Sequence, residues 1–168
     1  MKDLTEIENV IVDRLNHWSS IALGANHKVL GIECTSNIKN IIGEYGLELG
    51  YEVSASGNIK FDSEWLYDVI WSNSNEFGFS RLELILESEL SRNLEQIKYD
   101  FDKLLVGNAN HRIMICMTLG NGKGVKLILK QCSDSVSNYE LLAKDSRFLV
   151  LIWDDYDSGK FLPHLIIK

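Results

Sequence analysis

Two apolar runs in the second half of the chain constrain its fold more than any other feature. Residues 111–119 (HRIMICMTL) and 147–154 (RFLVLIWD) carry apolar side chains at odd and even positions alike. A strand with this pattern is buried on both faces, which is typical of a central strand in a sheet covered by helices. Helical patterns at 125–132 and 138–143 lie between the two runs. The second half therefore predicts an α/β arrangement.

The first half of the chain predicts further helices and an antiparallel meander. Apolar residues recur every three or four positions in 4–18 and 36–49, which is the period of an amphipathic helix. Residues 28–34 between them fit either a strand or a loop. The remaining expected elements are strands at 51–56, 59–72 and 79–89, turns at 56–58 and 73–78, a helix at 93–106 and a last strand at 161–167. Pro163 predicts that this last strand lies at an edge. Together the patterns predict a mixed central sheet flanked by helices on both faces.

Composition limits the class of protein. The length of 168 residues predicts one domain, 1–168, and the net charge of −7 argues against a protein that coats nucleic acid with Lys and Arg. The three cysteines are far apart in the sequence and form no CxxC pair. Neither a basic, apolar leader nor a run of roughly 18 apolar residues is present, so we expect no membrane span and a reducing, cytoplasmic location.

Three acidic residues interrupt the apolar strands. Asp68 lies in EWLYDVIW, and Glu87 and Glu89 lie in LELILESEL. Glu87 and Glu89 are two positions apart, so both point to one face of a strand, and a hairpin through 73–78 would place Asp68 beside Glu87. Carboxylates gathered in this way repel one another unless cations neutralise them. Oxygen ligands of this kind suit Mg²⁺ or Mn²⁺, so the pattern predicts a metal site at Asp68, Glu87 and Glu89.

The same residues also fit a structural interpretation. Glu87 and Glu89 could line a solvated sheet face, with Asp68 in a local cap or ion pair. Other candidate groups are weaker: the four histidines are scattered, and the glycine-rich loop at 120–124 lacks the ending of a phosphate-binding loop. Trp65 and Trp71 lie on the strand face opposite Asp68 and are expected in the core.

Over residues 36–119 the chain resembles the PD-(D/E)xK nuclease superfamily, the restriction-endonuclease-like fold. The core of that fold is a helix, a three-stranded antiparallel meander, a second helix and a further strand, which is the order expected here. The resemblance implies that Asp68 is the metal-binding aspartate of the second core strand. It matches the (D/E)xK triplet to Glu87-Ser88-Glu89, and matches the acidic residue of the first core helix to Glu44, with Glu48 as the second choice. Glu89 stands where the family has lysine, and Lys98 is a candidate replacement on the following helix.

The resemblance implies a magnesium-dependent endonuclease, or a manganese-dependent one, that hydrolyses phosphodiester bonds in DNA or RNA. Asp68 and Glu87 would hold the ion, Glu89 would act as general base or bind a second ion, and Glu44 would orient water. The main alternative is an inactive protein with a nuclease fold that serves as a binding or assembly subunit, as a homodimer or with a protein partner. A third alternative is an acidic protein-binding module.

Overall fold

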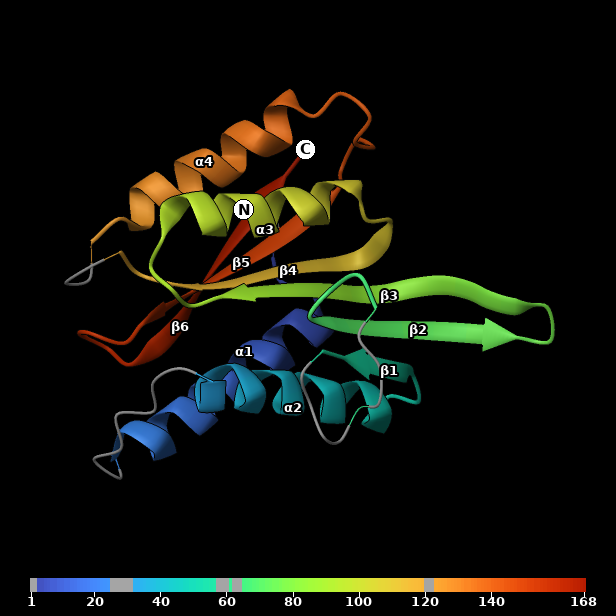
Figure 1. The fold of residues 1–168 in the computed structure, drawn as a ribbon, viewed down its shortest axis with the longest axis horizontal. Helices are drawn as coiled ribbons and strands as arrows, with labels where there is room; N and C mark the ends of the chain where they lie inside the picture. The colour runs from blue at the N-terminus through green and yellow to red at the C-terminus, as the bar shows by residue number, and fades with distance from the viewer. Residues whose placement is uncertain (1–2, 25–31, 57–60, 62–64, 120–122) are drawn as a thin grey trace.

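A six-stranded mixed sheet lies between two layers of helices (Figure 1). The computed structural model describes residues 3–24, 32–56, 61, 65–119 and 123–168. Its elements are α1 (Glu6–Gly24), α2 (Ile32–Glu48), β1 (Glu52–Ala55), β2 (Val69–Asn75), β3 (Gly78–Glu89), α3 (Leu94–Val106), β4 (Ala109–Met117), α4 (Val125–Asn138), β5 (Arg147–Asp154) and β6 (Lys160–Ile167). The predicted mixed sheet flanked by helices is confirmed.

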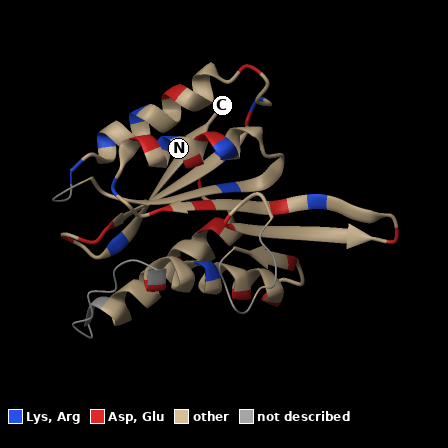
Figure 2. Ribbon diagram, in the orientation of Figure 1, with Lys and Arg blue, Asp and Glu red and all other residues tan. Residues whose placement is uncertain are grey.

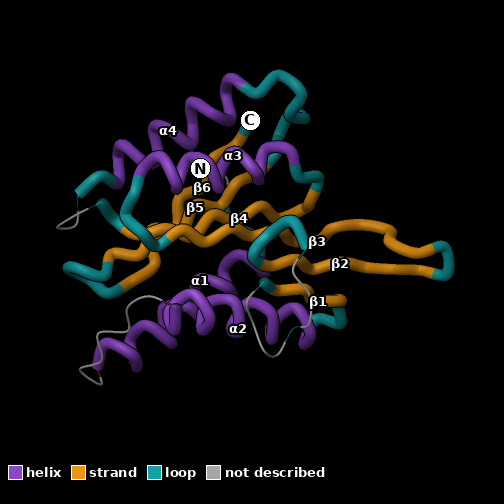
Figure 3. The backbone as a smooth tube through the Cα atoms, viewed as in Figure 1, coloured by secondary structure: helices purple, strands orange, loops and turns teal. Residues whose placement is uncertain are grey.

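The strands lie in the sheet in the same order as in the sequence. β1, β2 and β3 form an antiparallel meander, β3, β4 and β5 are parallel, and β6 pairs antiparallel with β5. The parallel pairs require crossovers, which α3 and α4 supply on one face, whereas α1 and α2 cover the other (Figure 3). The carboxyl ends of β3, β4 and β5 therefore meet at one end of the sheet.

Each face of the sheet has its own apolar core. Trp71, Leu84 and Leu86 pack with α1 and α2, whereas Ile70, Ile85 and the side chains of β4 at alternate positions pack with α3 and α4. This alternation is the period of two that the sequence shows in 79–89. A β-bulge between β2 and β3 interrupts it, because Trp71 pairs with Leu84 but Ser72 pairs with Leu82. Beyond the bulge the β2–β3 hairpin projects past the rest of the sheet (Figure 1).

Local chemistry explains where the helices begin and end. Thr5 and Glu8 form a capping box at the start of α1, in which each side chain accepts a hydrogen bond from the other's backbone N–H. Asn93 caps α3 by accepting from the backbone N–H of Glu95 at 2.9 Å. Gly50 follows α2 with φ of 83°, the left-handed conformation that favours glycine after a helix.

Several expected elements differ from the structure. Residues 32–34 belong to α2 and not to a strand or loop, and residues 73–75 belong to β2 and not to a turn. In the described part of the strand predicted at 59–72, β2 begins at Val69, because Leu66 takes φ of 54° and Trp65 bridges Tyr67 in a tight turn. The second helix predicted at 138–143 is instead a series of turns after α4, which itself continues to Asn138. The segments 28–31, 57–58 and 120–122, which include parts of the ambiguous segment, of the predicted turn and of the glycine-rich loop, lie outside the described residues.

None of the helices, as far as the chain is described, combines the length and the apolar character needed to cross a membrane.

Candidate functional site

Asp68 lies directly before β2 and is held from three directions. Its Oδ1 accepts hydrogen bonds from Lys39 Nζ at 2.8 Å and from Ser56 Oγ at 3.0 Å, and its Oδ2 accepts from the backbone N and the Oγ of Ser88, both at 2.8 Å. Burial alone would raise the pKa of Asp68, but the bonds and charge of Lys39 and the bonds from Ser88 outweigh it and lower that pKa. Asp68 is therefore ionised and bonded to α2, to β3 and to Ser56, the residue that follows β1.

Glu87 lies on β3 and faces the other helical layer. Its side chain is 3% exposed, and Lys103 Nζ of α3 lies 2.6 Å from its Oε1. Burial raises the pKa of Glu87 to about 7, the nearby charge of Asp68 and Asp100 adds to the rise, and Lys103 opposes it. Near neutral pH this carboxyl group therefore exchanges its proton readily, as a general acid or base must.

Asp100 and Glu89 complete the acidic cluster around Lys103. Lys103 Nζ also lies 3.2 Å from Asp100 Oδ1 on the preceding turn of α3. Burial raises the pKa of Asp100, and the charges of Glu89 and Asp68 raise it further, against the effect of Lys103. Glu89 is half-buried and accepts a hydrogen bond from the backbone N–H of Ser91 at 2.6 Å. The charges of Asp68 and Asp100 act on Glu87, those of Glu89 and Asp68 act on Asp100, and Lys103 pairs with both Glu87 and Asp100.

The structure places the other predicted site residues elsewhere. Glu44 is exposed on α2, and its charge acts on Arg14 of α1. Glu48 forms an ion pair with Arg14, with 2.5 Å between Oε2 and Nη2. Lys98 pairs with Asp102 on its own helix. The lysine beside Glu87 is Lys103. Asp68, directly before β2, and Glu87 of β3 pair with lysines of different helices, whereas Glu44, Glu48 and Lys98 interact with other residues.

Asp68 and Glu87 each have a lysine partner, and the two lysines come from different helices. Asp68 bonds to Lys39 of α2 and Glu87 pairs with Lys103 of α3, so the two acids are neutralised from opposite sides of the sheet. Within the described ranges, no three Asp, Glu, His or Cys side chains are grouped as a metal site requires. The carboxylate oxygens are hard ligands, which suit Mg²⁺ or Mn²⁺, but Oε1 of Glu87 is already paired with Lys103.

The remaining candidate residues separate into core and surface. Trp71 is fully buried, as expected, but Trp65 is 46% exposed, so the expectation that Trp65 is a core residue is wrong. The reason is the turn at Leu66, which takes Trp65 out of the strand. The three cysteines are buried and unpaired, and burial raises the pKa of Cys34 to about 12, which makes its thiol a poor nucleophile.

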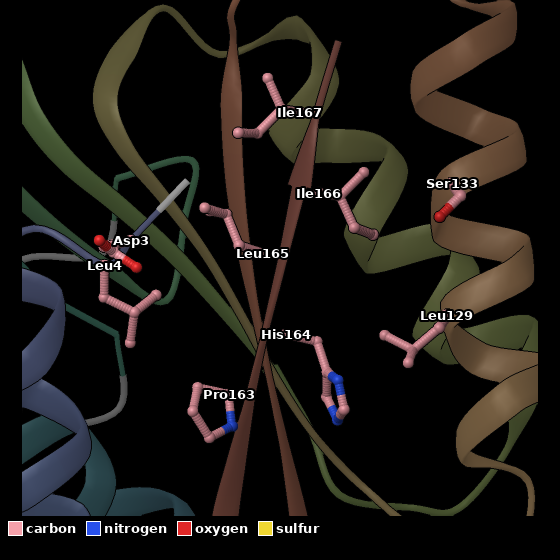
Figure 4. A pocket seen from close by; sticks show the side chains of 9 residues that line it. All are labelled: Asp3, Leu4, Leu129, Ser133, Pro163, His164, Leu165, Ile166 and Ile167. Atoms are coloured by element: carbon pink, nitrogen blue, oxygen red, sulfur yellow. The ribbon is translucent and has the colours of Figure 1, made fainter. Parts of the chain in front are cut away.

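A hollow of about 520 Å³ lies beside β6, the last strand of the sheet (Figure 4). His164 and Ile166 point toward Leu129 and Ser133 of α4, whereas Pro163 and Leu165 point to the other side of the strand. Burial lowers the pKa of His164, whose Nε2 makes no hydrogen bond. None of the acidic site residues lines this hollow.

Sequence reasoning did not identify Lys39, Asp100 or Lys103 as members of the cluster. Asp100 and Lys103 interrupt no apolar run, since they lie beside the apolar stripe of an ordinary amphipathic helix. Asp100 and Lys103 are three positions apart, so both lie on one side of α3. The sequence does not show that this side faces β3. In comparisons with known proteins, no family model, no curated protein and no solved structure matches this chain.

Proposed function

We propose that the protein is a metal-dependent phosphodiester hydrolase with a restriction-endonuclease-like core, acting on DNA or RNA. The observation that carries the proposal is the buried carboxyl of Glu87 beside Lys103, with Asp68, Glu89 and Asp100 near it. Perturbed titratable groups in one cluster are typical of catalytic sites. The order from α2 to β4, helix, three antiparallel strands, helix and strand, supports the same family.

Each residue of the cluster has a role in such a reaction. Asp68 and Glu87 would hold a divalent ion, which when bound supplies a Lewis acid for the phosphate and acidifies a water molecule. Glu89 would take the proton of the attacking water or bind a second ion. Lys103 carries a positive charge on the side of α3, where it can offset negative charge that develops on the phosphate. Lys103 would thereby replace the lysine that Glu89 displaces from the motif.

One observation favours the second candidate, an inactive nuclease-fold subunit that binds or assembles with a partner. Both carboxylate oxygens of Asp68 accept hydrogen bonds from protein groups, Oδ1 from Lys39 and Ser56 and Oδ2 from Ser88. An aspartate bonded in this way ties α2 to the sheet, and a metal ion would need to displace part of this network. On α3 and α4 the basic residues are also interleaved with acidic ones (Figure 2), so neither of these two helices carries an uninterrupted row of basic residues for a phosphate backbone.

A cleavage assay with matched variants tests the two candidates. Supercoiled plasmid, single-stranded DNA and RNA would be incubated with Mg²⁺, Mn²⁺ or EDTA and with wild type, Glu87→Gln, Asp68→Asn or Lys103→Met. Lys98→Met is the matched control, because Lys98 is on the same helix and pairs only locally. We expect cleavage that requires the metal, is lost in the first three variants and survives in the control.

Two further results would decide against hydrolysis. Cleavage that persists in all variants would come from a contaminant. No cleavage together with no Mn²⁺ binding by calorimetry would favour the inactive subunit.

A further inference from the structure

Two exposed aromatic side chains lie beside each other near β1: Trp65, which precedes β2, and Phe79 of β3. Trp65 and Phe79 are 46% and 53% exposed, and their ring centroids lie 5.3 Å apart with 61° between the ring planes. They line a hollow of about 290 Å³. We call this hollow the aromatic shelf; its lining residues are Glu52, Val53, Ser54, Trp65, Ile70, Ser72 and Phe79. Two exposed aromatic rings in one hollow are unusual in a chain that buries its other large aromatic clusters.

The fold leaves the shelf uncovered by helices. In the register of β1 and β2, Glu52 pairs with Ser72 and Ser54 pairs with Ile70, so these four side chains share a face. Ile70 packs in the core on the side of α3. However, α3 packs on β3 and β4, and α4 packs on β6, so the same face at β1 and β2 lies outside both helices.

The charge at the shelf is negative. Glu52 is exposed, and its Oε2 accepts a hydrogen bond from Ser74 Oγ at 2.7 Å. None of the described residues that line the shelf is basic. The nearest basic residue of the hairpin, Arg81, pairs with Glu83 at 3.1 Å. A carboxylate beside two aromatic faces attracts a cation and repels a phosphate backbone.

The backbone next to the shelf can accept an extended segment. β1 is the first strand of the sheet, and among the described residues it pairs with β2 alone, so its other edge is not paired with any described strand. A segment that pairs with this edge would project alternate side chains to the face of Glu52 and Ser54. A long cationic side chain in that segment would reach the shelf beside β1.

We propose that the aromatic shelf binds the Lys or Arg side chain of an extended basic segment of a partner protein, which pairs with the β1 edge. The cation lies against Trp65 and Phe79 and opposite Glu52. This inference goes beyond hydrolysis and holds whether or not the Glu87 cluster is active, because none of its residues belongs to that cluster. The net charge of −7 would also attract a basic partner to the protein.

Peptide binding to the full chain tests the proposal. The probe is a short labelled peptide of alternating Lys and Val, measured by fluorescence anisotropy at low and high salt. A peptide with Glu in place of Lys and a backbone N-methylated peptide are the controls. We expect saturable binding of the Lys peptide that weakens with salt, and little binding of either control peptide.

Variants locate the site. Trp65→Ala and Glu52→Gln should each weaken binding about tenfold, whereas Trp65→Phe keeps a ring and should weaken it less. Tyr99→Ala is the matched control, because Tyr99 is an aromatic residue 67% exposed on α3 and away from the shelf. Glu52→Gln decides the test if Trp65→Ala fails to fold, since Glu52 is a surface residue.

Four results would overturn the proposal. The first is no saturable binding of the Lys peptide, and the second is equal binding of the Glu or N-methylated peptide. The third is competition by a single-stranded oligonucleotide for the same site, which would identify nucleic acid as the occupant. The fourth is self-association in sedimentation that Trp65→Ala abolishes, which would identify a second copy of the chain.

Discussion

Replacing Glu87 by Gln should remove a pH dependence of stability that this residue imposes. Burial raises the pKa of Glu87 from 4.5 to about 7 in the folded protein. The folded state thus holds this proton more tightly than the unfolded state. The stabilising contribution is complete below about pH 4.5 and is lost as the pH rises through about 7. The difference between the two pKa values corresponds to about 3 kcal/mol.

Gln keeps the shape of the protonated carboxyl without its titration. The free energy of unfolding of the wild type should therefore fall by about 2–3 kcal/mol between about pH 5 and pH 8, and Glu87→Gln should lose this fall. At about pH 8 the variant should be the more stable protein. Urea unfolding followed by tryptophan fluorescence, with EDTA present, measures both proteins across this range.

The comparison isolates Glu87 from other groups. His164, whose pKa burial lowers, adds stability as the pH rises, but it does so equally in both proteins. Glu89→Gln is the matched control two positions along the same strand, where the side chain is half-buried. Parallel pH profiles for wild type and Glu87→Gln would refute the reasoning. A variant less stable than wild type at about pH 8 would also refute it, since the pair with Lys103 would then outweigh burial.

Three further predictions concern the fold. Glu8→Gln should destabilise the protein by about 3–5 kcal/mol in thermal or urea unfolding, because it breaks a buried ion pair with Arg147 at 2.8 Å; a loss under 1 kcal/mol (roughly the value of a surface pair) would contradict it. Gly46→Ala should cost about 1–3 kcal/mol, because a Cβ there would lie 2.5 Å from Nε1 of Trp71, and an unchanged melting temperature would show that α2 shifts freely. Phe77→Ser should leave the melting temperature nearly unchanged, since the Phe77 side chain is 90% exposed. A clearly lower melting temperature in calorimetry would contradict this prediction.

Sequence patterns predicted the layers because burial follows simple periods. The apolar runs became the central strands β4 and β5. Of the predicted apolar stripe of α3, Ile97, Phe101, Leu104 and Leu105 are buried and Leu94 is partly buried. The start of β2 could not be predicted in this way. Residues 65–68 are as apolar and aromatic as a strand, but the left-handed conformation of Leu66 breaks the pairing, and no local residue preference indicates it.

The acidic cluster shows a different limit. The interruption of apolar strands identified Asp68, Glu87 and Glu89, because a charge within an apolar run requires a partner. The sequence pattern did not show which residues are the partners of these acids. Lys39 and Lys103 lie on helices that reach the sheet from opposite sides, so only the packing of those helices determines that lysines neutralise the acids.

The two lysine partners differ in what they leave available for chemistry. Lys39 is the partner of an aspartate whose pKa is lowered, so that pair is a stable link between α2 and the sheet. Lys103 is the partner of a glutamate whose pKa is raised to about 7, because burial outweighs the attraction. A pair that stays partly protonated near neutrality can exchange its proton, or exchange its lysine for another cation, at small cost. For the proposed hydrolase we therefore expect Glu87 to exchange its lysine for a metal ion more readily than Asp68 does.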